Sequence, residues 1–170
     1  MKSFKVIPVM LALAAGWSYA NAAADFVTLR RSQTNLSDSV PQLLITFTLP
    51  STLNRSSSTS NSAVLDLEAL GVEFNYDEVY VNPGTSPVCG DNATDAYQSE
   101  SVSTLQEHDD DNLKTEWAAN HIAFSSALLA TGSNQLMICI RNIDGEAGPS
   151  AGNLDDISVR SLVLHYHTTQ

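Results

Sequence analysis

Residues 42–49 read "QLLITFTL", and apolar side chains recur there at every second position. Leu43, Phe47 and Leu49 belong to one face of this stretch, whereas Thr46 and Thr48 belong to the other. Successive side chains of a β-strand point to opposite faces, so a period of two predicts a strand with one buried face. The stretch therefore predicts β-structure rather than a helix.

The same period recurs along much of the chain. It is found in residues 26–31, 63–74 (with a change of phase to Leu70, Val72 and Phe74), 78–82, 134–142 and 157–167. Within the fourth of these stretches, Ile138 and Ile140 face inward, which leaves Met137, Cys139 and Arg141 on the outside. Six or more short strands with little helical pattern predict an all-β fold, an antiparallel β-sandwich of jelly-roll type in a single domain with long loops.

The last of these stretches changes phase along its length. Ile157 and Val159 face inward at its start, whereas Leu162 and Leu164 face inward further on. One extra residue is needed to bring both sets to the same face of a strand. A β-bulge near Arg160–Ser161 is therefore predicted.

Turn-rich segments separate the strands. Residues 50–62 are rich in Ser, Thr and Asn and predict a mobile loop. A much longer connection extends from Pro83 to Asn120, and within it residues 103–108 and 112–121 show a weak helical pattern. Loops of this length are usually functional or disordered, so this connection is the first place to look for a site.

The N-terminal residues predict export. Two lysines are followed by an apolar run (residues 6–17) that is too short to cross a bilayer, and Ala20-Asn21-Ala22 is an A-x-A cleavage motif. We expect residues 1–22 to be a signal peptide and residues 23–170 to be the domain of a secreted protein, whether extracellular, on the cell surface or periplasmic. The mature chain has no second long apolar stretch, so no membrane insertion is expected.

The charge of the mature chain limits its partners. Once Lys2 and Lys5 are removed, six basic residues face nineteen acidic ones, a net charge of −13. Nucleic acids and anionic membranes are bound through patches of Lys and Arg. The composition therefore argues against a nucleic-acid partner, and it is compatible either with simple solubility or with attraction of cations.

Cys89 and Cys139 are the two cysteines of the chain. In an oxidising compartment an isolated pair of this kind predicts one disulfide, and without a CxxC motif the pair makes a poor zinc site. Because the alternation places Cys139 on the outer face of its strand, the segment that carries Cys89 must cross that face.

A serine-hydrolase pattern also occurs. Residues 148–152, "GPSAG", fit G-x-S-x-G, and acids at 155–156 and histidines at 165 and 167 follow in the chain order of an α/β-hydrolase triad. A nucleophile elbow needs a strand before its serine and a helix after it, but Ser150 leads into a predicted strand. We interpret this stretch as a turn and expect no catalytic activity.

Two patterns suggest metal ions. Asp109, Asp110 and Asp111 form an acidic run that could supply oxygen ligands to calcium, although the spacing does not fit an EF-hand. A solvated acidic loop is the alternative interpretation. His165 and His167 share one face of the last strand and could hold a transition metal if a neighbouring strand supplied a third ligand.

Three segments resemble the galactose-binding-like jelly-roll superfamily. They are "VYVNPG" (79–84), the turn and strand at 128–136, and "DDISV" (155–159), spread over roughly the last hundred residues. The resemblance implies a jelly roll in which Gly132 and Asn134 serve the turn. It also implies a recognition module, because members are often carbohydrate-binding domains, and members often carry a structural calcium.

The long connection holds the densest mixture of groups that could bind a ligand. The predicted ligand-binding residues are Asp91, Asn92, Asp95, Tyr97 and Trp117. Aromatic rings can stack on sugars while Asp and Asn bond to hydroxyl groups. Alternatively, Trp117 plugs one end of the sandwich.

The leading functional hypothesis is a secreted, non-catalytic recognition module that binds an extracellular glycan or surface protein through loops at one end of the sandwich. The alternative is a structural subunit of a matrix, surface layer or filament whose edge strands pair with those of its neighbours, which would make the protein a homo-oligomer. A secreted hydrolase is a weaker alternative.

Overall fold

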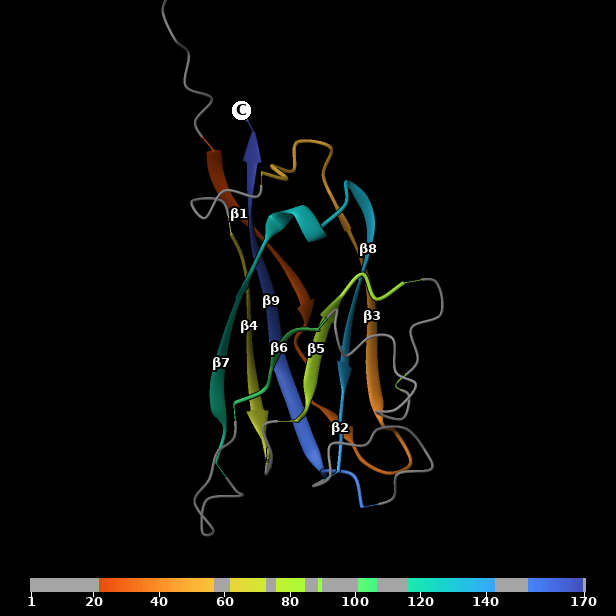
Figure 1. The fold of residues 1–170 in the computed structure, drawn as a ribbon. Helices are drawn as coiled ribbons and strands as arrows, with labels where there is room; N and C mark the ends of the chain where they lie inside the picture. The colour runs from red at the N-terminus through yellow and green to blue at the C-terminus, as the bar shows by residue number, and fades with distance from the viewer. Residues whose placement is uncertain are drawn as a thin grey trace, which may run out of the picture.

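The computed structural model describes residues 22–56, 62–72, 76–84, 89, 101–106, 116–142 and 153–169. Within these ranges the chain forms nine β-strands and one short 3₁₀ helix, η3 (Ser126–Leu128) (Figure 1). The strands are β1 (Ala22–Arg30), β2 (Thr34–Leu36), β3 (Gln42–Leu49), β4 (Ala63–Leu70), β5 (Glu78–Val81), β6 (Ser101–Thr104), β7 (Ala118–Phe124), β8 (Gly132–Cys139) and β9 (Ile157–Thr169). No helix of this part of the chain is long and apolar enough to cross a membrane.

The strands form two antiparallel sheets that pack against each other. The first sheet has the order β1-β9-β4-β7, with β2 also paired to β9, and the second has the order β3-β8-β5-β6. From β3 onward, every connection except β5 to β6 passes from one sheet to the other. The predicted all-β, antiparallel β-sandwich is thereby confirmed, and its jelly-roll type stays a prediction.

The core lies between the two sheets and follows the alternation of the sequence. In β4, buried and half-buried residues alternate without exception, so that Leu65 and Leu67 lie inside while Asp66 and Glu68 point outward. Leu43, Phe47 and Leu49 of β3 are buried in the same core. Burial of each such large apolar side chain contributes about 1.5–3 kcal/mol, which is what fixes the inward face of each strand.

The predicted bulge in β9 is present. Ser161 has a φ angle of 56°, and the pairing of β9 with β4 shifts register between Asp66 and Glu68. As a result, Val159 and Leu162 are both fully buried although three positions separate them. The bulge also brings Arg160 opposite Glu68 on the outer face of the first sheet.

The turn into β8 uses the two residues expected to serve it. Gly132 has a φ angle of 87°, a left-handed conformation that favours glycine. The buried Asn134 accepts a hydrogen bond from the N–H of Ala130 (2.7 Å) and donates to the carbonyl oxygens of Ala130 (2.7 Å) and Gly132 (2.9 Å). Asn82, at the end of β5, donates to the same Asn134 side chain (3.0 Å), so the two turns support each other.

The weak helical pattern at 103–108 and 112–121 is wrong wherever the structure describes these residues. Ser103 and Thr104 belong to β6, which pairs with β5, and residues 118–121 belong to β7, which pairs with β4. Pairing with a neighbouring strand and burial of one face outweigh weak local helix propensity. The connection from Pro83 to Asn120 is therefore not a single loop.

Candidate ligand-binding face

The outer face of the first sheet, which we call the open face, carries the outward side chains of β4, β7 and β9. Alternation places Asp66 and Glu68 there from β4, His121 from β7, and Arg160 and His165 from β9. Each of these residues is exposed or half-buried. The open face is therefore a polar surface in contact with solvent, assembled from three adjacent strands.

Trp117, the residue just before β7, stands beside this face. The guanidinium carbon of Arg160 lies 3.9 Å from the centre of its ring. Arg160 Nε also donates a hydrogen bond to Glu68 Oε2 (2.8 Å). This hydrogen bond is the main reason why the pKa of Glu68 lies below its ordinary value. Because Trp117 is half-buried, the structure places it at the surface as an aromatic ring flanked by a positive and a negative group.

A second polar group lies further along the open face. Asp66 lies between two histidines: its Oδ1 is hydrogen-bonded to His121 Nδ1 (2.7 Å), and its Oδ2 lies 3.0 Å from His165 Nε2. An ionised carboxylate can only accept, so His121 Nδ1 is the donor of the first contact. The exposed Phe26 of β1 lies beside His165, with ring centres 6.2 Å apart. This cluster presents aromatic edges and hydrogen-bonding groups to solvent.

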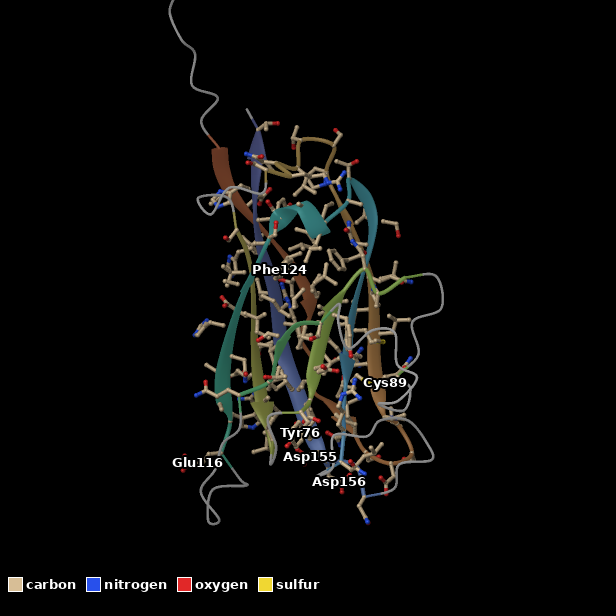
Figure 2. All side chains as sticks on the ribbon, viewed as in Figure 1. Tyr76, Cys89, Glu116, Phe124, Asp155 and Asp156 are labelled. Carbon is tan, nitrogen blue, oxygen red and sulfur yellow. A yellow bond between two sulfur atoms is a disulfide. The ribbon has the colours of Figure 1, made fainter. Side chains whose placement is uncertain are left out.

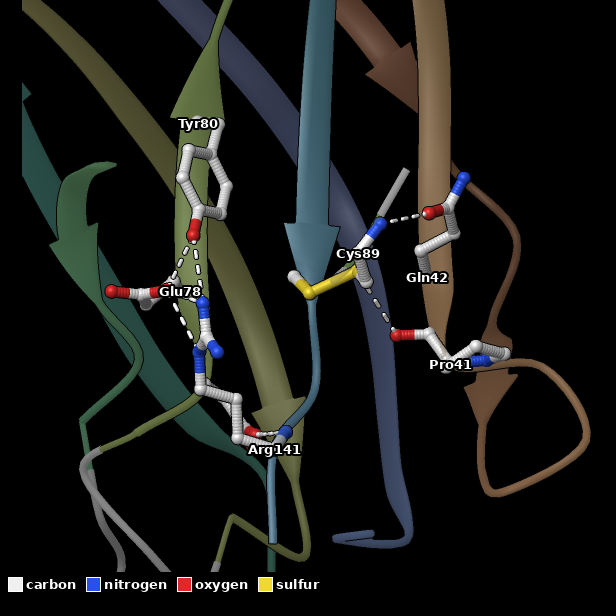
Figure 3. Close-up of a disulfide and its surroundings, with 8 residues drawn as sticks. Pro41, Gln42, Glu78, Tyr80, Cys89 and Arg141 are labelled. Carbon is white, nitrogen blue, oxygen red and sulfur yellow. Dashed lines mark hydrogen bonds and ion pairs between the residues drawn. A yellow bond between two sulfur atoms is a disulfide. The ribbon is translucent and has the colours of Figure 1, made fainter. Parts of the chain in front are cut away.

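The outer face of the second sheet is different where β5 lies beside the end of β8, and we call this part the covered face. Met137 and Cys139 of β8 and Tyr80 of β5 are fully buried there, although they point away from the core. The predicted disulfide joins Cys139 to Cys89 with a Cα–Cα distance of 5.8 Å. The N–H of Cys89 donates to the Gln42 side chain of β3 (2.8 Å), so Cys89 is tied to two strands on this face (Figure 3).

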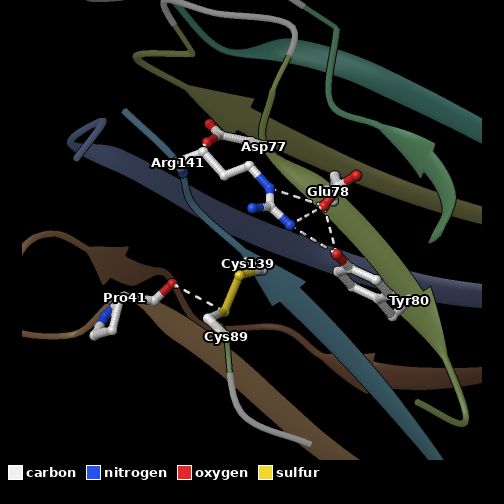
Figure 4. A network of polar contacts seen from close by, with 7 residues as sticks. All are labelled: Pro41, Asp77, Glu78, Tyr80, Cys89, Cys139 and Arg141. Carbon is white, nitrogen blue, oxygen red and sulfur yellow. Dashed lines mark hydrogen bonds and ion pairs between the residues drawn. A yellow bond between two sulfur atoms is a disulfide. The ribbon is translucent and has the colours of Figure 1, made fainter. Parts of the chain in front are cut away.

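An ion pair is buried on the covered face. The Arg141 side chain is 2% exposed; its Nε donates to Glu78 Oε2 (2.8 Å) and its terminal nitrogen contacts both that oxygen and the Tyr80 hydroxyl (Figure 4). Burial raises the pKa of Tyr80, and its bond to Glu78 acts in the same direction. The opposite charges of Arg141 and Glu78 neutralise each other inside the protein. The cluster therefore links β5 to the end of β8, and it does not face a ligand.

Two carboxyl groups are buried together at one end of the sandwich. Asp77 is fully buried and Asp155 is 4% exposed, and Figure 2 shows Asp155 and Asp156 at that end. Asp77 Oδ1 accepts the N–H of Arg141 (2.9 Å), and the N–H of Asp155 donates to the carbonyl oxygen of Arg141 (3.0 Å). Burial, followed by the charge of Asp155, raises the pKa of Asp77 to about 8.

Most predicted site residues fall outside the part of the chain that the structure describes. These are the ligand-binding residues Asp91, Asn92, Asp95 and Tyr97, the metal residues Asp109, Asp110 and Asp111, and Ser150. Trp117 is the predicted ligand residue that the structure places, at the edge of the open face rather than in the core. Of the acids that follow Ser150, Asp155 is buried beside Asp77 and Asp156 is exposed.

The pair of histidines in β9 does share one side of the strand, since the intervening Tyr166 is buried. The neighbouring strand β4 supplies Asp66 to His165, but no three His, Cys, Asp or Glu side chains of the described ranges are arranged to hold a metal ion. Sequence reasoning did not find the Asp66 cluster or the Arg160 group. Asp66, Glu68, Arg160 and His165 lie in predicted strands, whereas His121 lies in a segment with a weak helical pattern, and the sequence does not reveal which strands are neighbours.

Comparisons with known proteins identify no family for this chain. No protein-family model matches the chain, and no curated protein matches it.

Proposed function

We propose that the protein is a secreted, non-catalytic recognition module that binds an extracellular glycan on the open face, around Trp117. The observation that carries the proposal is the half-buried Trp117 ring in contact with the Arg160 guanidinium, which is in turn bonded to Glu68. An aromatic ring offers an apolar surface to the C–H face of a sugar. The guanidinium and carboxylate at its side can donate to and accept from the sugar hydroxyls.

The geometry favours a shallow, surface-exposed site. Arg160 and Glu68 are each 37% exposed, so a ligand can reach them without a change in the fold. Their mutual bond holds both in place before a ligand arrives, which lowers the entropy lost on binding. Predicted residues such as Asn92 and Tyr97 would extend the site beyond the open face.

A glycan array with the oxidised, mature protein tests the proposal. For any glycan that binds, Trp117→Ala is expected to weaken binding by about 1–3 kcal/mol, taking stacking of a base on an aromatic ring as the nearest measured analogue. Tyr76→Ala removes an aromatic ring that is 47% exposed and precedes β5 of the second sheet, and it should leave the affinity unchanged. Equal losses in both variants, or no loss in the first, would contradict the site.

The absence of catalysis is part of the proposal and rests on the sequence around Ser150. The chain after this serine leads into the long strand β9, which begins at Ile157, rather than into the helix that a nucleophile elbow requires. Ser150→Ala is expected to leave any ester or glycoside hydrolysis of the preparation unchanged. Hydrolysis abolished by that substitution would support a secreted hydrolase instead.

Export is also proposed, through cleavage after Ala22. The mature chain would then begin at Ala23, which is already paired with Thr168 in the first sheet. Mass spectrometry of the exported protein tests the cleavage site, and an N-terminus elsewhere would move the start of the domain.

Calcium binding is proposed for the acidic run Asp109–Asp111. Thermal unfolding in calcium and in EDTA tests it, with the triple Asp→Asn variant of the run as the comparison. Asp77→Asn serves as a control, because it replaces a buried carboxyl group with an amide of the same size and leaves the run intact. A calcium-dependent rise in the unfolding midpoint that disappears with the run, and not with Asp77, would support the proposal.

The second candidate function is a structural subunit of an extracellular assembly. The open edges of the two sheets favour it, since an edge strand presents unpaired backbone groups to a neighbour. A glycan array without binding, together with a ladder of oligomers on sizing, would favour this function over the first.

A further inference from the structure

One side of the sandwich is an apolar seam between the edges of the two sheets. The first sheet ends there at β1 and β2 and the second at β3, because β2 contacts β3 whereas β6 contacts β7 on the other side. Val27 and Leu29 of β1 and Ile45 of β3 pack against the core and remain partly exposed. The core is therefore less completely covered at this seam.

The backbone of β3 has free hydrogen-bonding groups at the seam. The N–H of Ile140 donates to the carbonyl of Pro41, so residues 41 and 140 form a hydrogen-bonded pair, and such pairs alternate along an antiparallel ladder. The backbones of Leu43 and Ile45 therefore bond to β8. The backbones of Leu44, Thr46 and Thr48 point away from β8. No other strand of the described ranges pairs with this edge.

The chain around β3 carries no charge. Residues 39–54 contain no Asp, Glu, Lys, Arg or His, within a chain of net charge −11. The exposed large apolar residues Val40 (46%) and Leu44 (39%) lie in the same segment. Two strongly acidic molecules repel each other over most of their surfaces, so an uncharged edge is where two copies can approach.

Two other edges, β1 and β6, are protected in ways that β3 is not, and the remaining edge strand, β7, carries the titratable His121. β1 carries Asp25 and has a register shift between Thr28 and Arg30, and charges and bulges discourage pairing with another strand. β6 has four residues. β3 instead pairs with β8 over eight residues without a shift.

We propose that two copies of this chain pair through β3 as an antiparallel, two-fold symmetric dimer with a continuous sheet across the interface. In the register centred on Ile45, Leu44 of each copy faces Thr46 of the second copy. The two Ile45 side chains then form a close, non-hydrogen-bonded pair that covers the seam. This interface is closed, because the same patch is used on both copies. It is independent of the glycan proposal, since the open face remains exposed.

The test is the mass of the oxidised, mature protein measured by light scattering and sedimentation over a range of concentrations. A reversible doubling of the monomer mass is expected. Thr46→Pro should abolish it, because proline removes an N–H that points away from β8 and is tolerated at a free edge. Leu44→Lys should abolish it by placing two like charges at the interface. Leu128→Lys alters a comparably exposed leucine outside the seam and should remain dimeric.

Hydrogen exchange gives a second measurement that does not depend on any variant. The amides of Leu44 and Thr46 should be protected at high concentration and lose protection on dilution, whereas the amides of Leu43 and Ile45 should be protected throughout. A monomer at every concentration overturns the proposal. A dimer that survives both β3 substitutions overturns it as well, and so does an open-ended ladder of oligomers.

Discussion

The open face and the covered face follow the same alternating pattern, and each carries an arginine paired with a glutamate. On the open face, Arg160 and Glu68 are each 37% exposed. On the covered face, Arg141 is 2% exposed and Glu78 is 13% exposed. Alternation fixes which way each of these side chains points from its strand, yet the two pairs lie in opposite environments.

The difference comes from a segment far away in the sequence. Cys89 lies fifty residues before Cys139, and the disulfide holds it against β8 on the covered face. Polar groups on that face must therefore satisfy one another, as Glu78 does with Arg141 and Tyr80. On the open face, equivalent groups remain available to a ligand.

Matched substitution of the two arginines is expected to give the largest contrast. Arg141→Met should lower the free energy of unfolding by about 3–5 kcal/mol, because it leaves the Glu78 carboxylate buried without its partner. Arg160→Met should cost less than about 1 kcal/mol, because water replaces the guanidinium. Urea unfolding of both variants measures the difference, and equal costs would refute the distinction between the two faces.

Loss of the disulfide is the next test of the comparison. A loop of fifty residues closed by a disulfide stabilises the fold by up to about 4 kcal/mol on the chain-entropy argument. The Cys89→Ala/Cys139→Ala variant should unfold at correspondingly lower urea and bind a hydrophobic dye on the uncovered face. Thiol titration of the unreduced, denatured wild type should find no free thiol; two reactive thiols would contradict the pairing.

Six of the nine described strands (β1, β3, β4, β5, β8 and β9) were predictable because the period of two is a local signal, whereas the short strands β2 and β6 were missed. The bulge at Arg160–Ser161 followed from a change of phase in one strand, and the disulfide from the count of cysteines and the side on which Cys139 lies. Strand β7 was missed in part because Ala118 and Ala119 are good helix formers, and pairing with β4 overrides that preference.

The site was less predictable, because it depends on which strands are neighbours. Asp66, His121 and His165 come from three strands and are up to 99 positions apart in sequence, so no local pattern links them. The burial of Arg141 was equally hidden, since alternation gave its side chain an outward direction and no local pattern indicated that it is 2% exposed. Trp117 stood out as the single tryptophan of the mature chain, and Arg160 beside it did not.

The buried carboxyl pair predicts a dependence of stability on pH. The pKa of Asp77 is about 4 in the unfolded chain and about 8 in the folded protein. Between pH 4 and pH 8 the folded protein therefore holds a proton that the unfolded chain has lost. The stability that this proton contributes is therefore present below pH 4 and is lost as the pH rises to 8. Asp77→Asn, which resembles the protonated acid, should flatten the decrease in urea midpoint between pH 5 and pH 8.

The exposed neighbour Asp156 provides the control for this experiment. Asp156→Asn removes the same formal charge and should leave the pH dependence of the wild type in place. A slope that is unchanged in the Asp77 variant, or flattened equally in both, would show that general charge repulsion causes the decrease.

The smallest effect on stability is expected for Asp66→Asn, which measures how far the binding face extends. The carboxylate and both imidazoles are at least one-third exposed, so water can replace their hydrogen bonds and the cost should remain below about 1 kcal/mol. Asp38→Asn is a suitable control, because Asp38 is exposed, bonds to the N–H of Leu154 and lies away from the open face. If a glycan spans the face from Trp117 to His121, the Asp66 variant should bind it more weakly while the Asp38 variant binds normally. Normal binding by both would confine the site to Trp117, Arg160 and Glu68.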